Sequence, residues 1–368
     1  MSVPTRPLPG WVDYGLLPLI NVGMAFLVAG VIVLFVGENP LEVVKIMLAG
    51  SFGYGEGIGY TLFYTTDFIF TGLAFAVAMH AGLFNIGAEG QAYIGGIGLA
   101  FVCLALDRIL PWWAVAPFAL VGAVAFGAAW AFIPAYLQAR RGSHVVITTI
   151  MFNFIAATLV QYLLVNVLRQ TGSMQPETRT FEAGGHLPKI QEVASWLGLD
   201  IAHSPLNLAF LLALLACLFV WVLIWRSKLG YEMRTFGHNP VAATYAGIST
   251  TKITIVAMMI SGGLAGMMAM NEIMGDQHRM LLDYTSGYGF VGIAVALMGR
   301  NHPVGIALAA LLFGVLYQGG AELAFEIPAI TRDMIIAIQA LVILFAGALE
   351  HMFRPALARL FSPAPQAV

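Results

Sequence analysis

Long apolar runs dominate the chain and are separated by short polar stretches. The run after Asp13 continues to Gly37 without a charged residue, and the run after Arg108 continues to Ala139. About 20 apolar residues in a helix span the hydrocarbon core of a bilayer, so both runs are long enough to cross it. Similar runs follow Arg141, Asp200, Lys252, Arg300 and Asp333, and shorter or more broken ones follow Asp67, Glu89 and Asp283. The pattern predicts an all-α polytopic membrane protein with about ten transmembrane helices.

The composition agrees with this class. Of the 368 residues, 60% are hydrophobic and 10% are charged, whereas a soluble domain carries about 25% charged residues. A soluble enzyme is therefore excluded, and lipid is the expected surrounding. The net charge is −2 and the basic residues are scattered, so no nucleic-acid surface is expected.

The basic residues predict the orientation of the chain. If the N-terminal tail is cytoplasmic, the inside segments carry Arg6, Arg140, Arg141, Arg226, Lys228, Arg234, Lys252, Arg300, Arg354 and Arg359. The outside segments then carry Lys45, Arg108, Arg169, Arg179, Lys189, Arg279 and Arg332. Because basic residues favour the cytoplasmic side, both termini are expected there.

Two polar stretches separate the later spans. Residues 169–205 are expected to form an external loop, and residues 226–252 an internal one. Neither is long or apolar enough for a domain of its own. The chain 1–368 is therefore predicted to be a single transmembrane domain.

Two glycine-rich segments interrupt the apolar pattern, one in each half of the chain. Gly82–Gln91 contains three glycines, two amides and a carboxylate, and Gly287–Phe290 is the second such segment. Transporters use broken helices where backbone groups must face a substrate path, which lipid would not allow. We expect two glycine-broken segments beside such a path.

Asn85, Glu89 and Gln91 are the candidate residues of the substrate pathway. A carboxylate close to membrane depth is a functional candidate by default, and amides suit a sugar hydroxyl or a base edge. The structural alternatives remain open: Glu89 could cap the helix that follows it, and the amides could satisfy the broken backbone. Asp67 is isolated in an apolar stretch, and we expect the span to begin after it rather than Asp67 to face a wet cavity.

No catalytic constellation is visible. The patterns H-E-x-x-H and G-x-S-x-G are both missing from the sequence, so no catalytic residue and no metal site is predicted. The G-x-x-x-x-G-K-[ST] loop that cradles ATP phosphates is also missing, so any ATP hydrolysis must come from another polypeptide.

A short helix is predicted inside the second polar stretch. Asn239 is a favourable N-cap, Pro240 suits the first helical position, and Gly247 can end the helix, which gives Pro240–Ala246. An ordinary connecting turn is the alternative.

The motifs together resemble one family of transporters. The segment from Gly230 to Ile248 resembles the cytoplasmic coupling loop of ABC importer permeases of the branched-chain amino acid, ribose and nucleoside type. Gly82–Gln91 resembles the asparagine and glutamate motif of the nucleoside or simple sugar branch, and Gly292–Pro303 resembles a later motif of that branch. The resemblance covers most of the chain between about residues 60 and 350.

The resemblance implies a permease subunit, not an enzyme, that moves nucleosides or related simple sugars into the cell across the bacterial inner membrane. It implies cytoplasmic ATPase subunits that bind the ATP, an extracytoplasmic substrate-binding lipoprotein and a second permease subunit in a heterodimer. It assigns the ATPase coupling to Arg234, Gly237, His238, Asn239 and Pro240. The alternative is an ion-coupled secondary transporter, which needs intramembrane acidic residues, and Glu89 is the strongest candidate for that role.

Overall fold

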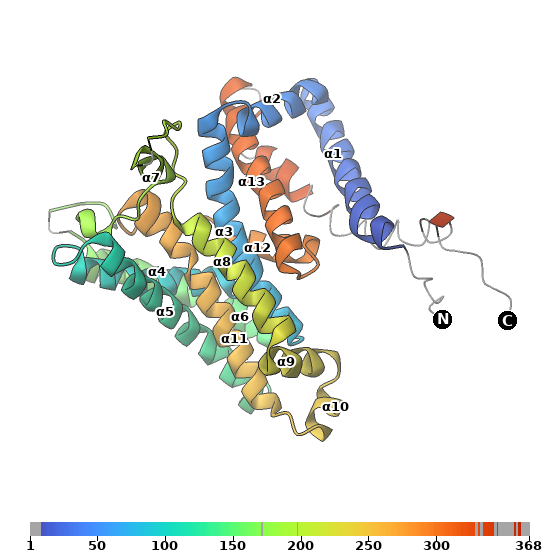
Figure 1. The fold of residues 1–368 in the computed structure, drawn as a ribbon, viewed down its shortest axis with the longest axis vertical. Coiled ribbons are helices and arrows are strands. Elements are labelled where there is room, and N and C mark those ends of the chain that lie inside the picture. The colour runs from blue at the N-terminus through green and yellow to red at the C-terminus, as the bar shows by residue number, and fades with distance from the viewer. Residues whose placement is uncertain are drawn as a thin grey trace. The chain divides into compact units, whose positions relative to one another are not determined.

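The computed structural model describes residues 9–170, 172–196 and 198–327, together with 330–331, 334–341, 344, 357 and 360–361. Within these residues the regular structure is helical, and strand-like pairing is limited to three isolated bridges. The prediction of an all-α protein is therefore confirmed (Figure 1). Most of the last expected crossing, after Asp333, lies outside the described residues, as do Arg6, Arg332, Arg354 and Arg359.

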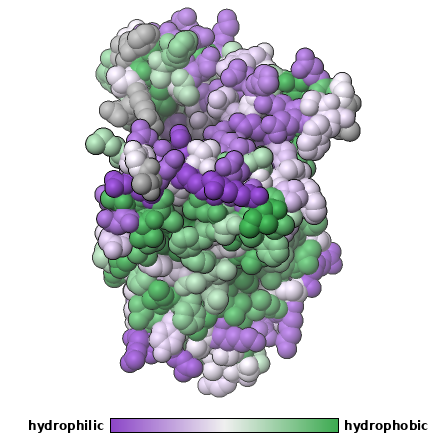
Figure 2. Space-filling model, turned by 90° about the vertical axis from the view of Figure 1, so that its left-hand side faces the viewer, coloured by the Kyte–Doolittle hydropathy of each residue, from purple (hydrophilic) through white to green (hydrophobic). Residues whose placement is uncertain are grey.

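Seven of the described helical segments are long and apolar enough to cross a membrane. They are Gly55–His80, Ala88–Leu106, Trp112–Arg141, Val145–Leu168, Ala209–Arg226, Thr250–Gln277 and Pro303–Glu326. A helix pair bent by 117°, Phe26–Phe35 with Pro40–Phe52, would make an eighth. On the face shown in Figure 2, hydrophobic side chains form a band with hydrophilic side chains above and below it. A polytopic membrane protein is thus supported, and the number of about ten crossings stays a prediction.

The chain divides into two compact units, residues 1–53 with 315–368, and residues 54–314. The first unit contains α1 (Leu17–Val36), which follows the π-helical turn η1 (Val12–Leu16), and α2 (Pro40–Phe52). Its core is formed by Ala29, Val33, Val43, Met47, Leu316, Leu323, Ile330, Ile335 and Ile338. The side chain of Asn39 accepts a hydrogen bond from Leu41 N (3.0 Å) and starts α2, as an N-cap with proline at the next position favours.

The second unit holds the remaining helices. They are α3 (Gly55–His80), α4 (Ala88–Leu106), α5 (Trp112–Arg141), α6 (Val145–Leu163) with η2 (Leu164–Leu168), η3 (Ala183–Gly185), α7 (Ile190–Trp196), α8 (Ala209–Trp221) with η4 (Val222–Arg226), α9 (Lys228–His238), α10 (Pro240–Tyr245), α11 (Thr250–Gly266), η5 (Met270–Gln277) and α12 (Tyr288–Met298). Helix α13 (Pro303–Glu326) begins in this unit and ends in the first. Helices α3 and α4 are the most buried of the early spans.

Glycines allow the central helices of this unit to approach closely. A Cβ at Gly95 would lie 2.5 Å from the Cα of Gly266, and a Cβ at Gly262 would overlap the carbonyl oxygen of Gly127. Small residues at such positions let helix backbones pack directly in a membrane. Gly262 and Gly266 therefore serve close helix packing.

Asp67 lies in the middle of α3, and its side chain is fully buried. The expectation that the span begins after Asp67 is therefore wrong. Helix α3 begins twelve residues earlier, at Gly55, because the polar side chains of its first half face protein rather than lipid. Thr61, Thr65 and Thr66 in that half are buried as well.

An ion pair fastens the segment 169–205 to the end of α4. Both guanidinium nitrogens of Arg179 donate to the Asp107 carboxylate, at 2.7 and 2.8 Å, and Glu182 N donates to the same carboxylate at 2.8 Å. The Asp107 side chain is fully buried, whereas 22% of the Arg179 side chain is exposed. Burial alone would raise the pKa of Asp107, but the hydrogen bonds and charge of Arg179 outweigh it and hold the pKa below the usual value.

We predict that Arg179→Gln lowers the stability of the folded protein by about 3 kcal/mol, because it leaves a buried carboxylate without its cation. Thermal unfolding of the purified protein in detergent measures the loss. Arg108→Gln is the matched control: its ion pair with Glu182 is exposed on both sides and should contribute less than about 1 kcal/mol.

The sign of the pH dependence follows from the lowered pKa of Asp107. A carboxyl whose folded-state pKa is below its unfolded value stabilises the fold above the unfolded pKa. This contribution is lost as the pH falls through the folded-state pKa, so wild type and Arg179→Gln should differ most at neutral pH. Equal stability of Arg179→Gln and Arg108→Gln at neutral pH would contradict this account.

Candidate functional site

The two glycine-rich segments of the sequence lie against each other. The first covers most of the connection between α3, which ends at His80, and α4, which begins at Ala88, and the second is the N-cap and first turn of α12. The first segment thus joins two separate helices, each long enough to be a span. Whether either segment breaks a membrane span stays a prediction, but their contact is a finding.

Glu89, in the first turn of α4, makes this contact. Its Oε1 accepts hydrogen bonds from the Thr285 hydroxyl and from Gly287 N (3.1 Å), and its Oε2 accepts one from Gly289 N (2.7 Å). These backbone groups belong to the start of α12, where unpaired N–H groups and the helix dipole favour a negative charge. Glu89 therefore caps a helix, as the structural alternative proposed, but caps α12 rather than its own helix.

Gly289 is required for this arrangement. A Cβ on Gly289 would lie 2.5 Å from the Cα of Glu89 and 2.7 Å from its Oε2. The backbone of α12 can therefore reach the carboxylate only because no side chain stands between them. This explains the glycine at this position of the second segment. The sequence showed the glycine-rich pattern but did not show that Glu89 is the residue it contacts.

A tyrosine pair makes a second contact between the segments. The rings of Tyr93 and Tyr284 stack at 5.6 Å between centroids. The Tyr284 hydroxyl donates to Ala92 O (2.6 Å), and the Tyr93 hydroxyl bonds to Asp283 Oδ1 (3.4 Å). Sequence reasoning missed both tyrosines, because a tyrosine near a span end is also typical of the membrane interface.

Asn85 and Gln91 bind each other. Asn85 Nδ2 donates to Gln91 Oε1 (2.9 Å) and to the Ser261 hydroxyl (2.8 Å), and Gln91 Nε2 donates back to Asn85 Oδ1 (3.2 Å). The Ser261 hydroxyl in turn donates to Ala74 O (2.6 Å) on α3. Both amides are buried, so in this conformation they link α3, α4 and α11 rather than face an open channel.

Asn153 holds the same segment from α6. Its Nδ2 donates to Ile86 O (2.9 Å), and its Oδ1 accepts from Gly90 N (2.9 Å). Sequence reasoning missed Asn153 and Ser261, although a polar residue in an otherwise apolar run was the available signal. Asn153 and Asn85 thus satisfy Ile86 O and Gly87 N, two backbone groups of the buried connection at 81–87.

The predicted short helix near residue 240 is confirmed. Helix α10 spans Pro240–Tyr245, one residue shorter than expected, and Asn239 Oδ1 accepts hydrogen bonds from Val241 N and Ala242 N, both at 3.0 Å. Gly247 follows with φ of +79° and ends the turn. His238 is the last residue of α9 and is exposed.

Gly237 allows α9 to pack closely against the end of α3. It lies inside α9, and a Cβ there would overlap His80 O and would lie 2.9 Å from Gly82 N. Its missing side chain lets α9 pack directly on the backbone at the end of α3. Arg234, three residues earlier, is half-buried, and its Nε has no hydrogen-bond partner among the described residues.

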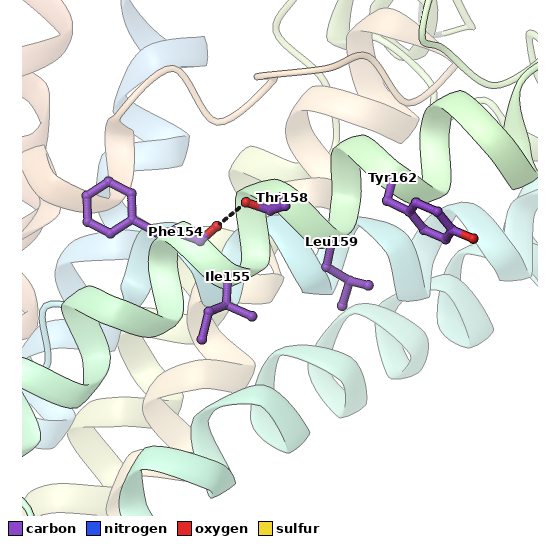
Figure 3. Close-up of a pocket in the computed structure, with 5 residues that line it drawn as sticks. All are labelled: Phe154, Ile155, Thr158, Leu159 and Tyr162. Carbon is purple, nitrogen blue, oxygen red and sulfur yellow. Dashed lines mark hydrogen bonds between the residues drawn. The ribbon is translucent and has the colours of Figure 1, made fainter.

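A shallow apolar depression on the outer side of α6 lies apart from these residues. Phe154, Ile155, Thr158, Leu159 and Tyr162 line it, and Figure 3 shows them along one side of the helix. The Thr158 hydroxyl donates to Phe154 O (2.9 Å). Apart from this group and the Tyr162 hydroxyl the lining is apolar, so the depression is better suited to lipid chains than to a polar solute.

The polytopic helical fold and its buried polar core are typical of a membrane transport protein. The chain belongs to the family described as branched-chain amino acid transport system / permease component, which matches residues 57–346. It is 36% identical to the guanosine ABC transporter permease protein NupP of Bacillus subtilis, over 90% of this chain and 93% of NupP. It is 33% identical to the glucose ABC transporter permease protein TsgB13 of Haloferax volcanii, over 95% of this chain and 91% of TsgB13.

A second guanosine ABC transporter permease protein of Bacillus subtilis, NupQ, is 29% identical over 69% of this chain and 78% of NupQ. All three relatives are named as permease proteins of ABC transporters. The comparisons therefore support the ABC importer class, and the alternative of an ion-coupled secondary transporter is wrong.

We predict that Glu89→Gln slows transport at least about tenfold while membrane insertion stays normal. The neutral amide keeps the size of the side chain but weakens the hydrogen bonds to Gly287 N and Gly289 N, because bonds to a charged acceptor contribute about 1.5–3 kcal/mol. Uptake at matched expression measures the effect. Glu56→Gln, the same change at an exposed position in α3, should transport at the wild-type rate. Wild-type uptake by Glu89→Gln would remove Glu89 from the mechanism.

Proposed function

We propose that this chain is the transmembrane permease subunit of an ABC importer that moves nucleosides or related simple sugars into the cell. The observation that carries the proposal is the 36% identity with a guanosine permease protein over nine tenths of this chain. The match to a glucose permease protein supports the wider class of small polar solutes. ATP binding and hydrolysis belong to separate subunits in this scheme, since the chain has no phosphate-binding loop.

Three kinds of protein partner complete the importer. ABC ATPase subunits dock on the cytoplasmic side, and an extracytoplasmic substrate-binding lipoprotein delivers the solute. The third partner is a second, different permease subunit. The similarity of this chain to two distinct guanosine permease proteins from one organism supports a heterodimer.

The whole chain acts as one permease domain of about ten crossings in the bacterial inner membrane. The seven long helices, the bent pair near the N-terminus, the short apolar helix Tyr288–Met298 and the apolar run after Asp333 together account for that number. Residues 169–205 face outward, residues 226–252 face the cytoplasm, and both termini are cytoplasmic. The distribution of basic residues supports this orientation.

Asn85, Glu89 and Gln91 brace the substrate pathway. Their hydrogen bonds join α3, α4, α11 and α12 around the connection at 81–87. A solute can pass only if these helices separate, since both amides are buried in the present conformation. These residues therefore position the helices that line the path. They contact the solute when those helices move apart.

Helices α9 and α10 provide the coupling to the ATPase. The short helix α10 exposes large apolar side chains, Val241 at 65% and Tyr245 at 90%, which suits a docking surface for a protein partner. Through Gly237, α9 packs on the backbone of His80 and Gly82. A rigid-body movement of α9 and α10 therefore reaches the segment that carries Asn85 without passing through a flexible side chain.

The proposed transport is tested by uptake in a strain that lacks this protein. Labelled guanosine, uridine and ribose should enter the complemented strain, and nucleosides should compete against pentoses. We expect the deletion to abolish high-affinity nucleoside uptake, because the permease forms the pathway. Unchanged uptake of all three solutes after deletion would contradict the proposal.

We predict that Gly237→Val and Arg234→Glu leave the protein in the membrane but abolish the stimulation of ATP hydrolysis by substrate in the assembled complex. The valine would force α9 away from the His80 backbone, and the acidic side chain would change a half-buried charge beside it. ATPase assays and co-purification with the ATPase measure both effects. Lys228→Glu, the same charge change at an exposed residue of α9, should behave as wild type. Normal stoichiometry and normal stimulation in both variants would disprove the coupling role.

A further inference from the structure

Two carboxyl groups are buried together inside the second unit, away from Glu89. Asp67 on α3 is 0% exposed and Glu272 on η5 is 5% exposed. The side chains of Glu272 and Asn271 are the polar groups that reach Asp67. Neither Asp67 nor Glu272 takes part in an ion pair within the described part of the chain.

Few hydrogen-bond donors lie around this pair. Asn271 Nδ2 donates to Phe63 O (3.1 Å), and Asn271 Oδ1 accepts from Asn207 Nδ2 (3.0 Å). Gln277 Nε2 donates to Glu272 Oε2 (3.0 Å). Both oxygens of Asp67 remain without a hydrogen-bond partner among the described residues. The pair is therefore rich in acceptors and poor in donors.

Such an arrangement costs folding free energy unless something satisfies it. An unpaired carboxylate in a protein interior destabilises the fold strongly. Ionisable side chains inside membrane helices usually serve a function. The nearest further charge, Asp276, is also acidic and is paired with Lys189 at 3.3 Å. Two carboxyl groups this close can share one proton, but the Asp67 oxygens still have no other donor among the described residues, and a solute with hydrogen-bond donors would supply it.

The backbone at Glu272 and the rings beside Asp67 point to a binding site. Residues 270–277 form a π-helix, a rare conformation that occurs frequently at functional sites. Tyr64, one turn before Asp67 on α3, lies close enough to Glu272 to be affected by its charge. The Tyr64 ring packs edge to face with Tyr288 at 6.3 Å, and Tyr288 packs with Phe68 at 5.3 Å. Aromatic side chains beside hydrogen-bonding groups suit a flat polar solute.

We propose that Asp67 and Glu272 form a solute-selecting site that binds two adjacent hydrogen-bond donors of a nucleoside, flanked by the aromatic rings of Tyr64 and Tyr288. This inference rests on the proposed function, nucleoside import, and assigns solute selection within the permease to these residues. Two parts of a nucleoside carry donors spaced for a carboxylate, the N1–H and 2-amino edge of guanine and the 2′,3′-diol of ribose. Tyr288 is the first residue of α12, whose start Glu89 caps, so opening at α12 would expose both sites together.

The test compares three labelled solutes in the assembled transporter, reconstituted in vesicles with its ATPase, second permease and lipoprotein. Guanosine carries both donor pairs, inosine lacks the 2-amino group, and 2′-deoxyguanosine lacks one hydroxyl of the diol. The wild type should prefer guanosine about tenfold over the analogue that lacks the engaged donors, because a site built to accept a donor discriminates strongly against its loss. In Asp67→Asn and Glu272→Gln that preference should fall to within about twofold.

The analogue that wild type rejects identifies the source of the donors: inosine for the base edge, 2′-deoxyguanosine for the ribose. Asp200→Asn, the same change at an exposed residue, should keep the wild-type preference. If the wild type discriminates against neither analogue, or if the variants are slower with unchanged preferences, the pair is structural and the proposal is overturned. If the wild type imports no nucleoside at all, the proposed function fails as well, which separates the two results.

If the variants fail to assemble, a second measurement on the wild-type protein tests the proposal. An apolar carbodiimide reacts with buried carboxyl groups, and mass spectrometry locates the modified residue. Saturating guanosine should reduce modification of Asp67 or Glu272 several-fold, while mannitol at the same concentration should not. Equal modification with and without guanosine would overturn the proposal.

Discussion

Hydrocarbon offers no hydrogen-bond partner, and this constraint governs the interior of the second unit. A lipid-facing helix satisfies its own backbone, but the connection at 81–87 is not helical and must be satisfied by protein. Asn85, in the connection itself, accepts from Gly87 N, and Asn153 on α6 binds Ile86 O and Gly90 N. Gln91 on α4 and Ser261 on α11 bind the Asn85 amide, and Ser261 also binds Ala74 O on α3. The arrangement of α3, α4, α6 and α11 therefore depends on these side chains.

Direct backbone contact is the second condition of the packing. Between membrane helices there is little hydrophobic driving force, so association depends on close van der Waals contact and on interhelical hydrogen bonds. Gly95, Gly127, Gly262 and Gly266 bring α4, α5 and α11 into backbone contact. Gly237 and Gly289 do the same at the two places where α9 and α12 meet the first glycine-rich segment. Because these helix backbones are closely packed, a movement of one helix is transmitted to the helix that it contacts.

The sequence predicts the helices better than it predicts which residues contact each other in the site. Local elements were predicted well: the apolar run after Arg141 forms the span Val145–Leu168, and α10 differs from its prediction by one residue. Both rest on local signals, namely length, capping and apolar runs. The position of Asp67 was misjudged because a buried carboxyl depends on residues some 200 positions away, which no local pattern records. The helix capped by Glu89 was unpredictable for the same reason, although the charge and the glycine pattern correctly marked the segment.

The contacts of Glu89 suggest how one packed interior can serve a pathway that opens and closes. A carboxylate that accepts three hydrogen bonds from the start of α12 holds that helix by several kcal/mol, since each such bond contributes about 1.5–3 kcal/mol. An equilibrium changes tenfold for every 1.4 kcal/mol or so, so the loss of two of these bonds alters the population of an open state by orders of magnitude. The same segment rests on α9 through Gly82 and Gly237. A displacement of α9 by a few tenths of an ångström must therefore be taken up at Gly82. The hydrogen bonds of Asn85 and Glu89, three and seven residues further on, join the same segment to α11 and to the start of α12.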